Sequence, residues 1–243
     1  MESCRSDAVV LMVSDYGESD KLVTLFTLEQ GKLRGIAKGA KKSFRRFGGC
    51  LEPFARLSVL LTLTAGLARL TSADAATIYP GIRSDLLKIS YAGYACEVVD
   101  FILPEGFANH RLFRLLTAYL QQLDTAPPEA SDRRFFEINL LNIMGYRPEL
   151  TRCSSCGNEL TGVPHCSAGT AGNLLCSRCG RGSQRVSPGT VAKLQAALKT
   201  GRFGAVSLTA AELAEAGGIL DPALALHVGR PFKSLAFLKE MGG

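Results

Sequence analysis

Four of the eight cysteines form two Cys-x-x-Cys pairs, Cys153/Cys156 and Cys176/Cys179, with 19 residues between the pairs. Zn²⁺ prefers four tetrahedral thiolate or imidazole ligands, and a Cys-x-x-Cys turn directs two sulfurs at one ion. The spacing is that of a zinc ribbon. The pattern therefore predicts one structural zinc ion held by Cys153, Cys156, Cys176 and Cys179.

Two other interpretations of these cysteines stay open: two local redox disulfides, or free thiols. A catalytic zinc is disfavoured because four cysteines leave no open position for water. A deaminase would also need His-x-Glu, whereas His110, His165 and His227 are followed two residues later by Leu, Ser and Gly. His165 and Cys166 lie between the pairs and are treated as bystanders, with Cys166 the first substitute ligand.

A second cluster of chemistry-bearing residues is the segment "KLRGIAKGAKKSFRR" (32–46). It holds seven of the 28 lysines and arginines and no acid, and the rest of the chain has 21 cations against 22 acids. A positive charge this local is typical of a polyanion site. The predicted nucleic-acid contacts are Lys32, Arg34, Lys38, Lys41, Lys42, Arg45 and Arg46.

The spacing within this segment suggests how the cations are arranged. Lys32, Arg34 and Lys38 occupy even positions of an expected strand and share one face, and the remaining four fall on the loop that follows. Phe44 and Phe47 either stack on bases or pack into the barrel. A solvated, flexible loop without a ligand is the simpler alternative.

The elements that must position these residues change character near Pro80. Before it, five short runs rich in β-branched and aliphatic residues predict strands at 8–13, 21–28, 32–38, 55–63 and 66–73. Five strands in about 75 residues suit a small barrel of the OB-fold type, with an SH3-like barrel as the alternative.

Helical periodicity follows, at 84–103, 109–123 and 131–145, after Ser187-Pro188, at 209–213 with a stop at Gly217-Gly218, and at 230–241. The predicted fold class is α+β: an N-terminal five-stranded β-barrel (OB-fold), then an all-helical domain with an inserted four-cysteine zinc module. The predicted boundaries are 1–78 for the barrel, 79–150 and 184–243 for the helical domain, and 151–183 for the zinc module.

No signal peptide or membrane span is predicted. The longest apolar stretch, "VLLTLTAGLARL", is interrupted by Thr, Gly and Arg and falls short of the roughly 20 residues that a span needs. We therefore expect a cytoplasmic protein with no membrane partner.

Several short motifs spread along the chain form one recognisable set. In the N-terminal part they are Tyr16, Glu18, Asp20, residues 24–27, Gly31-Lys32, Gly39 and Leu51-Glu52-Pro53. Further on they are the four-cysteine module after "RPELTRC" and the ending "HVGRPFKSLAFL". On these residues the chain resembles the RecO family of bacterial recombination and repair mediators. Some members lack the cysteines, so the four present here indicate a zinc-binding branch.

The resemblance implies binding of single- and double-stranded DNA, annealing of complementary strands, and loading of RecA with RecR onto gaps coated by single-strand-binding protein. It also implies a nucleoid-associated role in DNA repair and recombination after DNA damage. Carried over by position, Lys32 to Arg46 match the DNA-binding face. The pocket for the acidic tail of the single-strand-binding protein is not assigned to individual residues. Arg230 and Lys233 are either contacts for an acidic, hydrophobic peptide or simply solvated.

We expect no enzymatic activity, since neither a phosphate-binding Gly-x-x-x-x-Gly-Lys-[Ser/Thr] loop nor a Gly-x-Ser-x-Gly elbow is present. The main alternative is an RNA-binding zinc protein associated with ribosomes or translation. A thiol redox sensor and a metal-dependent nuclease are weaker alternatives.

Overall fold

The computed structural model describes residues 3–64, 66–160, 166–169, 171–181, 184–229 and 231–235. The chain divides into two compact units: Met1–Pro127 with Phe232–Gly243, and Pro128–Pro231. The domain boundaries expected from the sequence differ from these units, and they stay a prediction. His165, Arg230 and residues 236–241 of the expected last helix lie outside the described residues.

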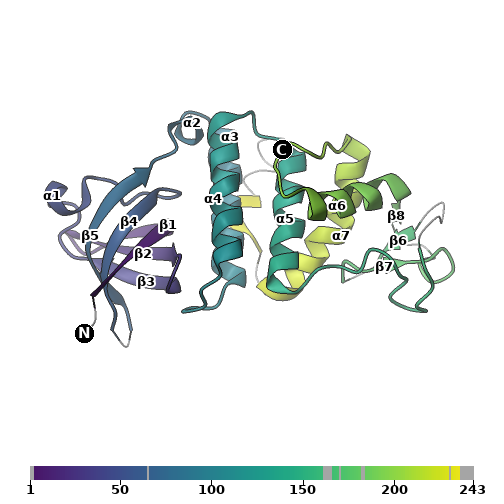
Figure 1. Ribbon diagram of the computed structural model, residues 1–243, viewed down its shortest axis with the longest axis horizontal. Coiled ribbons are helices and arrows are strands. Elements are labelled where there is room, and N and C mark those ends of the chain that lie inside the picture. Colours follow the sequence, from purple (N-terminus) through teal and green to yellow (C-terminus); the bar gives the residue numbers. More distant parts are fainter. Residues whose placement is uncertain are drawn as a thin grey trace. The chain divides into compact units, whose positions relative to one another are not determined.

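Five strands of the first unit close into a barrel in the order β1-β2-β3-β5-β4 (Figure 1). All neighbouring strands are antiparallel except β3 and β5, which are parallel and share the pairs Gly35–Ala68 and Ile36–Arg69. This confirms the predicted N-terminal five-stranded barrel. The strands are β1 (Ser3–Tyr16), β2 (Asp20–Thr27), β3 (Gly31–Ala37), β4 (Arg56–Thr62) and β5 (Ala68–Thr77).

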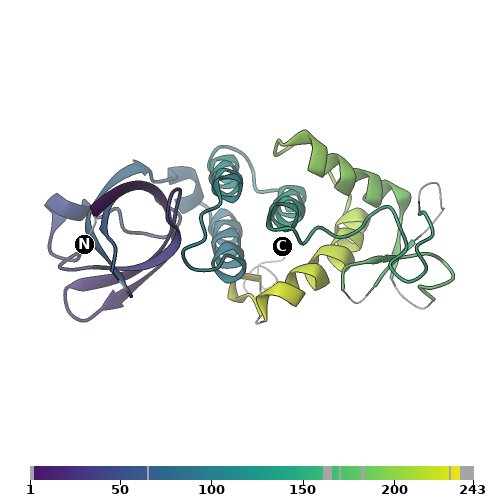
Figure 2. The same cartoon turned by 60° about the horizontal axis from the view of Figure 1, so that its bottom comes forward.

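The barrel interior is filled by alternating residues of its strands. On β4, Leu57, Val59 and Leu61 are fully buried, and the residues between them are partly exposed. This period of two is what a strand with one face in a core requires. Figure 2 shows the strands wrapping around that interior.

Residues 44–47 form a single helical turn, α1 (Phe44–Phe47), where the sequence predicted a loop. Gly48 ends the turn in the left-handed region, at φ 52°, which glycine adopts without steric cost. Phe47 is 1% exposed and packs into the barrel core. The loop prediction was wrong here because a buried anchor and a glycine stop hold these residues in a turn.

Three further helices belong to the first unit: α2 (Pro80–Arg83), α3 (Leu86–Ile102) and α4 (His110–Thr125). The side chains of Asp85 and Asn109 accept hydrogen bonds from N–H groups in the first turns of α3 and α4, as capping residues do. Gly31 allows the connection between these helices to approach the barrel, because a Cβ at Gly31 would collide with the backbone of Phe107.

The end of the described chain returns to the first unit. Glu97 of α3 accepts hydrogen bonds from the backbone N–H groups of Lys233 (3.0 Å) and Ser234 (2.9 Å). Phe232 stacks on Phe101, with ring centroids 5.8 Å apart, and meets Tyr94 edge-on at 5.4 Å. These contacts fasten residues 232–234 onto α3.

The second unit is built on α5 (Ala130–Met144), α6 (Pro188–Thr200) and α7 (Ala210–Val228). The start of α6 after Ser187 is as predicted. Arg134 of α5 is buried, donates to Glu137 at 2.7 Å and forms an ion pair with Asp221 of α7. This network joins α5 to α7.

The predicted stop at Gly217-Gly218 is wrong, because α7 continues through both glycines to Val228. The glycines serve close packing instead. A Cβ at Gly217 would lie 2.6 Å from Nη2 of Arg134, and one at Gly218 would collide with the side chain of Gln184.

Within the cysteine module three short strands form a small sheet in the order β7-β6-β8. Its strands are β6 (Cys166–Ala168), β7 (Leu174–Leu175) and β8 (Arg185–Val186). The α+β class, with helices and a cysteine module after the barrel, is thereby confirmed.

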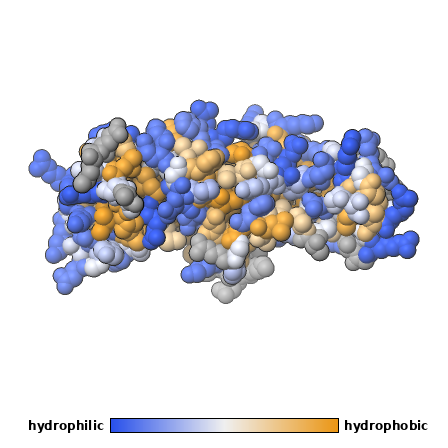
Figure 3. All heavy atoms as spheres, turned by 90° about the horizontal axis from the view of Figure 1, so that it is seen from below, coloured by the Kyte–Doolittle hydropathy of each residue, from blue (hydrophilic) through white to orange (hydrophobic). Residues whose placement is uncertain are grey.

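The helices also bear on the expectation that the chain has no membrane span. In the described part of the chain, no helix is both long and apolar enough to cross a bilayer. On the face of the barrel seen in Figure 3, hydrophobic atoms lie exposed between hydrophilic ones.

Candidate metal centre and nucleic-acid interface

Each Cys-x-x-Cys pair folds into the same tight turn. In the first turn the N–H of Gly157 donates to the carbonyl oxygen of Cys153 at 2.9 Å, and in the second Gly180 donates to Cys176 at 2.9 Å. Gly157 has φ 73°, in the left-handed region that favours glycine. The local sequence therefore directs both sulfurs of each pair to one side.

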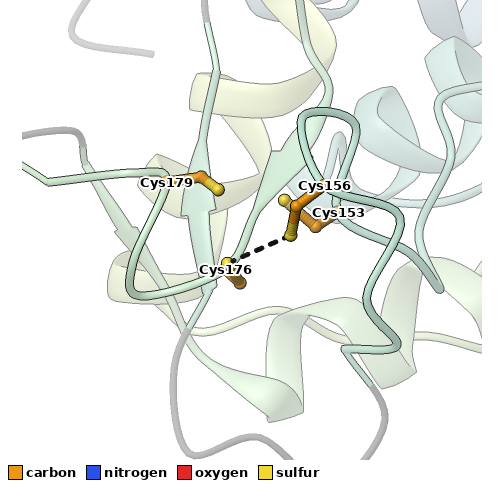
Figure 4. A group of neighbouring side chains, drawn as sticks. All are labelled: Cys153, Cys156, Cys176 and Cys179. Atoms are coloured by element: carbon orange, nitrogen blue, oxygen red, sulfur yellow. Dashed lines mark hydrogen bonds between the residues drawn. The ribbon is translucent and has the colours of Figure 1, made fainter.

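The two turns bring four sulfur atoms together, as Figure 4 shows. All four lie within 4.8 Å of one another, and the sulfurs of Cys156 and Cys176 are 3.7 Å apart. Tetrahedral coordination with Zn–S bonds of about 2.3 Å separates sulfurs by about 3.8 Å, whereas a disulfide bond measures about 2.05 Å. The cluster fits a four-coordinate metal ion.

Backbone N–H groups favour the ligating form of two of these thiols. The N–H of Cys176 is the largest cause of the low pKa of Cys153, which falls to about 6. The N–H of Cys179 likewise lowers the pKa of Cys176 below its ordinary 9.0. A thiolate is the form that binds metal, so the turns favour the ligating form of Cys153 and Cys176. Cys179 differs: a hydrogen bond with Ser155 lowers the pKa of its thiol, but hydrogen bonds with the other three thiols raise it to about 11.

Cys166, the substitute ligand considered from the sequence, has another role. It is buried on β6, and its Sγ donates to the carbonyl oxygen of Val186 at 3.6 Å. Burial raises the pKa of its thiol, which disfavours the thiolate. The metal-site cluster is formed by Cys153, Cys156, Cys176 and Cys179.

The cysteine module is anchored to α7 through Gly172. This residue has φ 74°, and a Cβ on it would collide with the carbonyl oxygen of Ile219 and with Ala223. Only a glycine lets the module approach α7 this closely. The cluster is thus held against a helix of the second unit.

The seven predicted DNA contacts all lie in the first unit, in three places. Two are on β3, three on the connection that follows, and two on α1. In this order they are Lys32 and Arg34, then Lys38, Lys41 and Lys42, then Arg45 and Arg46.

Three of the seven have partners within the protein. Lys32 is only 12% exposed and lies 3.3 Å from Asp100 Oδ1. Lys41 forms a 2.9 Å ion pair with Asp15. Arg46 donates to the carbonyl oxygen of Lys38 at 2.7 Å, which closes the connection between β3 and α1.

The other four cations, Arg34, Lys38, Lys42 and Arg45, form what we call the open cation set. All four are exposed, and in the described part of the chain their side chains have no ion pair or hydrogen bond. They are therefore available to an anionic ligand.

Arg69, which the sequence interpretation did not include, extends this set. It is exposed on β5 and pairs with Ile36 of β3. Residue type alone gave no signal, because its nearness to the basic segment depends on strand pairing between distant parts of the chain.

A groove of about 650 Å³ lies beside Arg34, between β3 and the loop that joins β4 to β5. Leu63 and Leu67 line it and are 38% and 42% exposed. Glu105 also lines it, so the groove places a cation and apolar side chains beside one carboxylate.

Phe44 of the basic segment and Phe47, which directly follows that segment, behave differently. Phe47 packs into the barrel core, whereas Phe44 is 82% exposed. Of the two alternatives that the sequence left open, packing into the barrel applies to Phe47, and only Phe44 remains available to a ligand.

Family models match nearly the whole chain: "Recombination protein O N terminal" over residues 1–79 and "Recombination protein O C terminal" over residues 83–236. The chain is 54% identical over 241 residues to "DNA repair protein RecO" of Geobacter metallireducens, covering 99% of each chain. It is 53% identical to the protein of that name from Geobacter sulfurreducens, again over 99% of each. With its counterpart from Myxococcus xanthus it shares 38% identity, over 100% of this chain and 99% of the relative. The chain therefore belongs to the RecO family of recombination and DNA repair proteins.

Proposed function

We propose that this protein binds single- and double-stranded DNA, anneals complementary strands and helps RecR to load RecA during recombinational repair. The observation that carries the proposal is the open cation set on the barrel. In the described part of the chain, these four side chains have no ion pair or hydrogen bond. Arg34 lies on β3, Lys38 and Lys42 on the connection that follows, and Arg45 on α1. The remaining cations and acids of the chain almost balance.

Annealing by this surface requires no covalent chemistry. Two DNA strands repel each other through their phosphates, and a positive surface lowers that repulsion when it displaces counterions. Contacts that are weak and tolerant of sequence let the strands search for register and then leave as a duplex. We therefore propose a mediator and not an enzyme.

The four-cysteine cluster supports a second part of the proposal, one structural zinc ion per chain. Its distances suit four thiolate ligands, and a site closed by four sulfurs leaves no position for a substrate. The ion would hold the two turns together and thereby hold the module on α7.

The proposed partners follow from the family. They are DNA, RecR and the single-strand-binding protein, and the proposed location is the bacterial cytoplasm, in association with the nucleoid. The backbone N–H of Lys233 donates a hydrogen bond to Glu97. A contact of the Lys233 side chain with an acidic, hydrophobic peptide stays a prediction.

The test removes the open cation set by changing Arg34, Lys38, Lys42 and Arg45 to Ala. Binding and annealing of labelled complementary oligonucleotides are followed across a salt series. Each lost phosphate contact lowers the slope of log K against log salt by about 0.7 for a single strand, so four contacts lower it by roughly 3. Unchanged binding and annealing would place the DNA site elsewhere.

A matched control removes the same charge elsewhere. Arg111 and Arg114 of α4, with Lys199 and Arg202 of the second unit, are changed to Ala. We expect this control to keep most of the salt slope. Stronger binding to structured RNA than to single-stranded DNA by the unaltered protein, without annealing, would favour the RNA-binding alternative.

A further inference from the structure

Phe44 is the most exposed of the large hydrophobic side chains that the structure describes, at 82%. A single exposed apolar residue needs no explanation by itself. Phe44 is distinguished by its surroundings, because it stands between Lys42 and Arg45, two members of the open cation set. An aromatic face flanked by cations without partners is a combination that suits nucleic acid.

The backbone that carries Phe44 is held on several sides. Its carbonyl oxygen accepts a hydrogen bond from the Gly48 N–H at 2.6 Å, and Ser43 donates its N–H to the carbonyl oxygen of Gly39 at 2.9 Å. Phe47, three residues on, is buried in the barrel core. The ring is therefore presented from a fixed turn.

A second exposed aromatic lies on the neighbouring turn of the barrel. Tyr16, at the end of β1, is 54% exposed. The turn that follows it is joined to the connection before α1, because Lys41 donates its N–H to the carbonyl oxygen of Ser19 at 3.0 Å and Gly39 donates to Asp20 at 2.7 Å. The Gly39 hydrogen bond lowers the pKa of Asp20, so this link stays charged and in place.

We infer that Phe44, assisted by Tyr16, stacks on unpaired bases of single-stranded DNA while the open cation set holds the phosphates. The inference rests on the proposed DNA binding and deepens it. Bases inside a duplex are already stacked, so these rings add affinity for single strands alone. The aromatic pair would thus let one surface prefer strands that still await a partner.

The change Phe44→Ala separates this role from that of the cations. Stacking contributes about 1–3 kcal/mol per base, which corresponds to a loss of affinity of about 5- to 150-fold. We expect Phe44→Ala to weaken binding to single-stranded DNA within this range, to leave duplex binding unchanged, and to leave the salt slope unchanged because every cation remains. Phe44→Tyr should retain binding, and Phe44→Leu should not.

Two controls sharpen the comparison. Leu86→Ala removes another exposed apolar side chain, 50% exposed at the start of α3, and should bind as the unaltered protein does. An oligonucleotide with abasic sites keeps the phosphates but offers no rings, so it should bind equally well to the unaltered protein and to Phe44→Ala.

The absence of tryptophan from the chain allows a direct measurement. Phe44→Trp introduces a single reporter, whose fluorescence a stacked base should quench on binding of normal single strands but not of abasic strands. Equal quenching by both, or unchanged affinity of Phe44→Ala, would overturn the inference.

Two variants together separate the stacking inference from the proposed function. If Phe44→Ala binds single-stranded DNA normally while the four-cation variant loses binding, only the stacking inference fails. Normal binding by both variants would also remove the proposed DNA site. A dimer that is lost in Phe44→Ala would assign the ring to an interface between copies and overturn the inference as well.

Discussion

The ammonium group of Lys32 lies 3.3 Å from Oδ1 of Asp100, and both side chains are largely covered, at 12% and 16% exposure. The same ammonium donates to the backbone carbonyl oxygen of Asp100. The first cation of the basic segment is thus already neutralised on α3. Its role differs from that of Arg34, two residues further along the same strand.

We predict that Lys32→Ala lowers stability and spares DNA binding. Removing one member of a largely buried pair leaves the other without compensation, which costs about 2 kcal/mol. Thermal unfolding followed by circular dichroism measures the loss. Lys42→Ala, which removes an exposed cation without a partner, serves as the control and should show the reverse pattern. A Lys32→Ala protein of normal stability that loses DNA affinity would contradict the prediction.

Removal of the metal ligands should destabilise the second unit. The binding energy of a structural zinc ion, about 10–16 kcal/mol in small zinc peptides, is part of their folding free energy. We therefore expect the double variant Cys153→Ala/Cys156→Ala to lose the metal and to unfold at a temperature several degrees below that of the unaltered protein. Elemental analysis should find one zinc per chain in the unaltered protein and none in the variant. The control variant Cys166→Ser should keep its zinc. If the melting curve of the double variant coincides with that of the unaltered protein, the four cysteines hold no structural ion.

The two glycines within α7 should respond oppositely to alanine. A Cβ at Gly217 would lie 2.6 Å from the guanidinium of Arg134, which is buried and held by Glu137 and Asp221. Overpacking there should cost about 1–3 kcal/mol. Gly218 faces the exposed side chain of Gln184, whose hydrogen bond to the carbonyl oxygen of Ala214 (3.2 Å) lies at the surface, where water can replace it when the side chain moves aside. Gly218→Ala should therefore stabilise the helix by up to about 1 kcal/mol. Urea unfolding of the two variants checks the order, and equal effects would contradict it.

Glu212 should make stability depend on pH in the acid range. The ammonium of Lys193, 2.6 Å away, is the main cause that lowers the pKa of Glu212 from 4.5 to about 2. A carboxyl with a lowered pKa in the folded state contributes stability that is fully present above its unfolded pKa. That contribution declines as the pH falls from about 4.5 through 2.

The comparison of Glu212→Gln with the unaltered protein isolates this effect. Glu212 also accepts a hydrogen bond from the backbone N–H of Thr209, the N-cap of α7, at 2.8 Å. Glutamine can keep this capping hydrogen bond but cannot ionise. We expect the variant to be the less stable protein above pH 4.5 and the difference to shrink toward pH 2. Protonation of the cysteines affects both proteins alike. Urea unfolding midpoints at a series of pH values measure the difference in stability between the two proteins. A difference that stays constant down to pH 2 would refute the prediction.

Local patterns in the sequence carried much of the fold. Runs rich in β-branched and aliphatic residues predict the barrel strands, that at 55–63 among them, and the cysteine spacing predicts which four sulfurs meet. Both signals act over short stretches of chain or through spacing that one kind of site requires. The α+β architecture could therefore be predicted without coordinates.

Features that depend on distant partners could not be predicted. The sequence predicts a helix stop at Gly217 and Gly218. The structure shows that Arg134 and Gln184 occupy the space that a Cβ at these positions would need. Likewise, the sequence of the basic segment does not distinguish Lys32, which has Asp100 as its partner, from Arg34, which is open. Such distinctions arise from tertiary contacts, which a run of like charges does not encode.

The hydrogen bonds from Lys233 and Ser234 to Glu97 also bear on how the protein is made. The first unit includes residues that follow the whole second unit in the sequence. During synthesis the barrel and α3 leave the ribosome long before the segment that completes them. The carboxylate of Glu97 and the rings of Tyr94 and Phe101 therefore lack Phe232, Lys233 and Ser234 as partners until the second unit has been synthesised. A nascent chain that stops before Phe232 would have its barrel but lack these contacts.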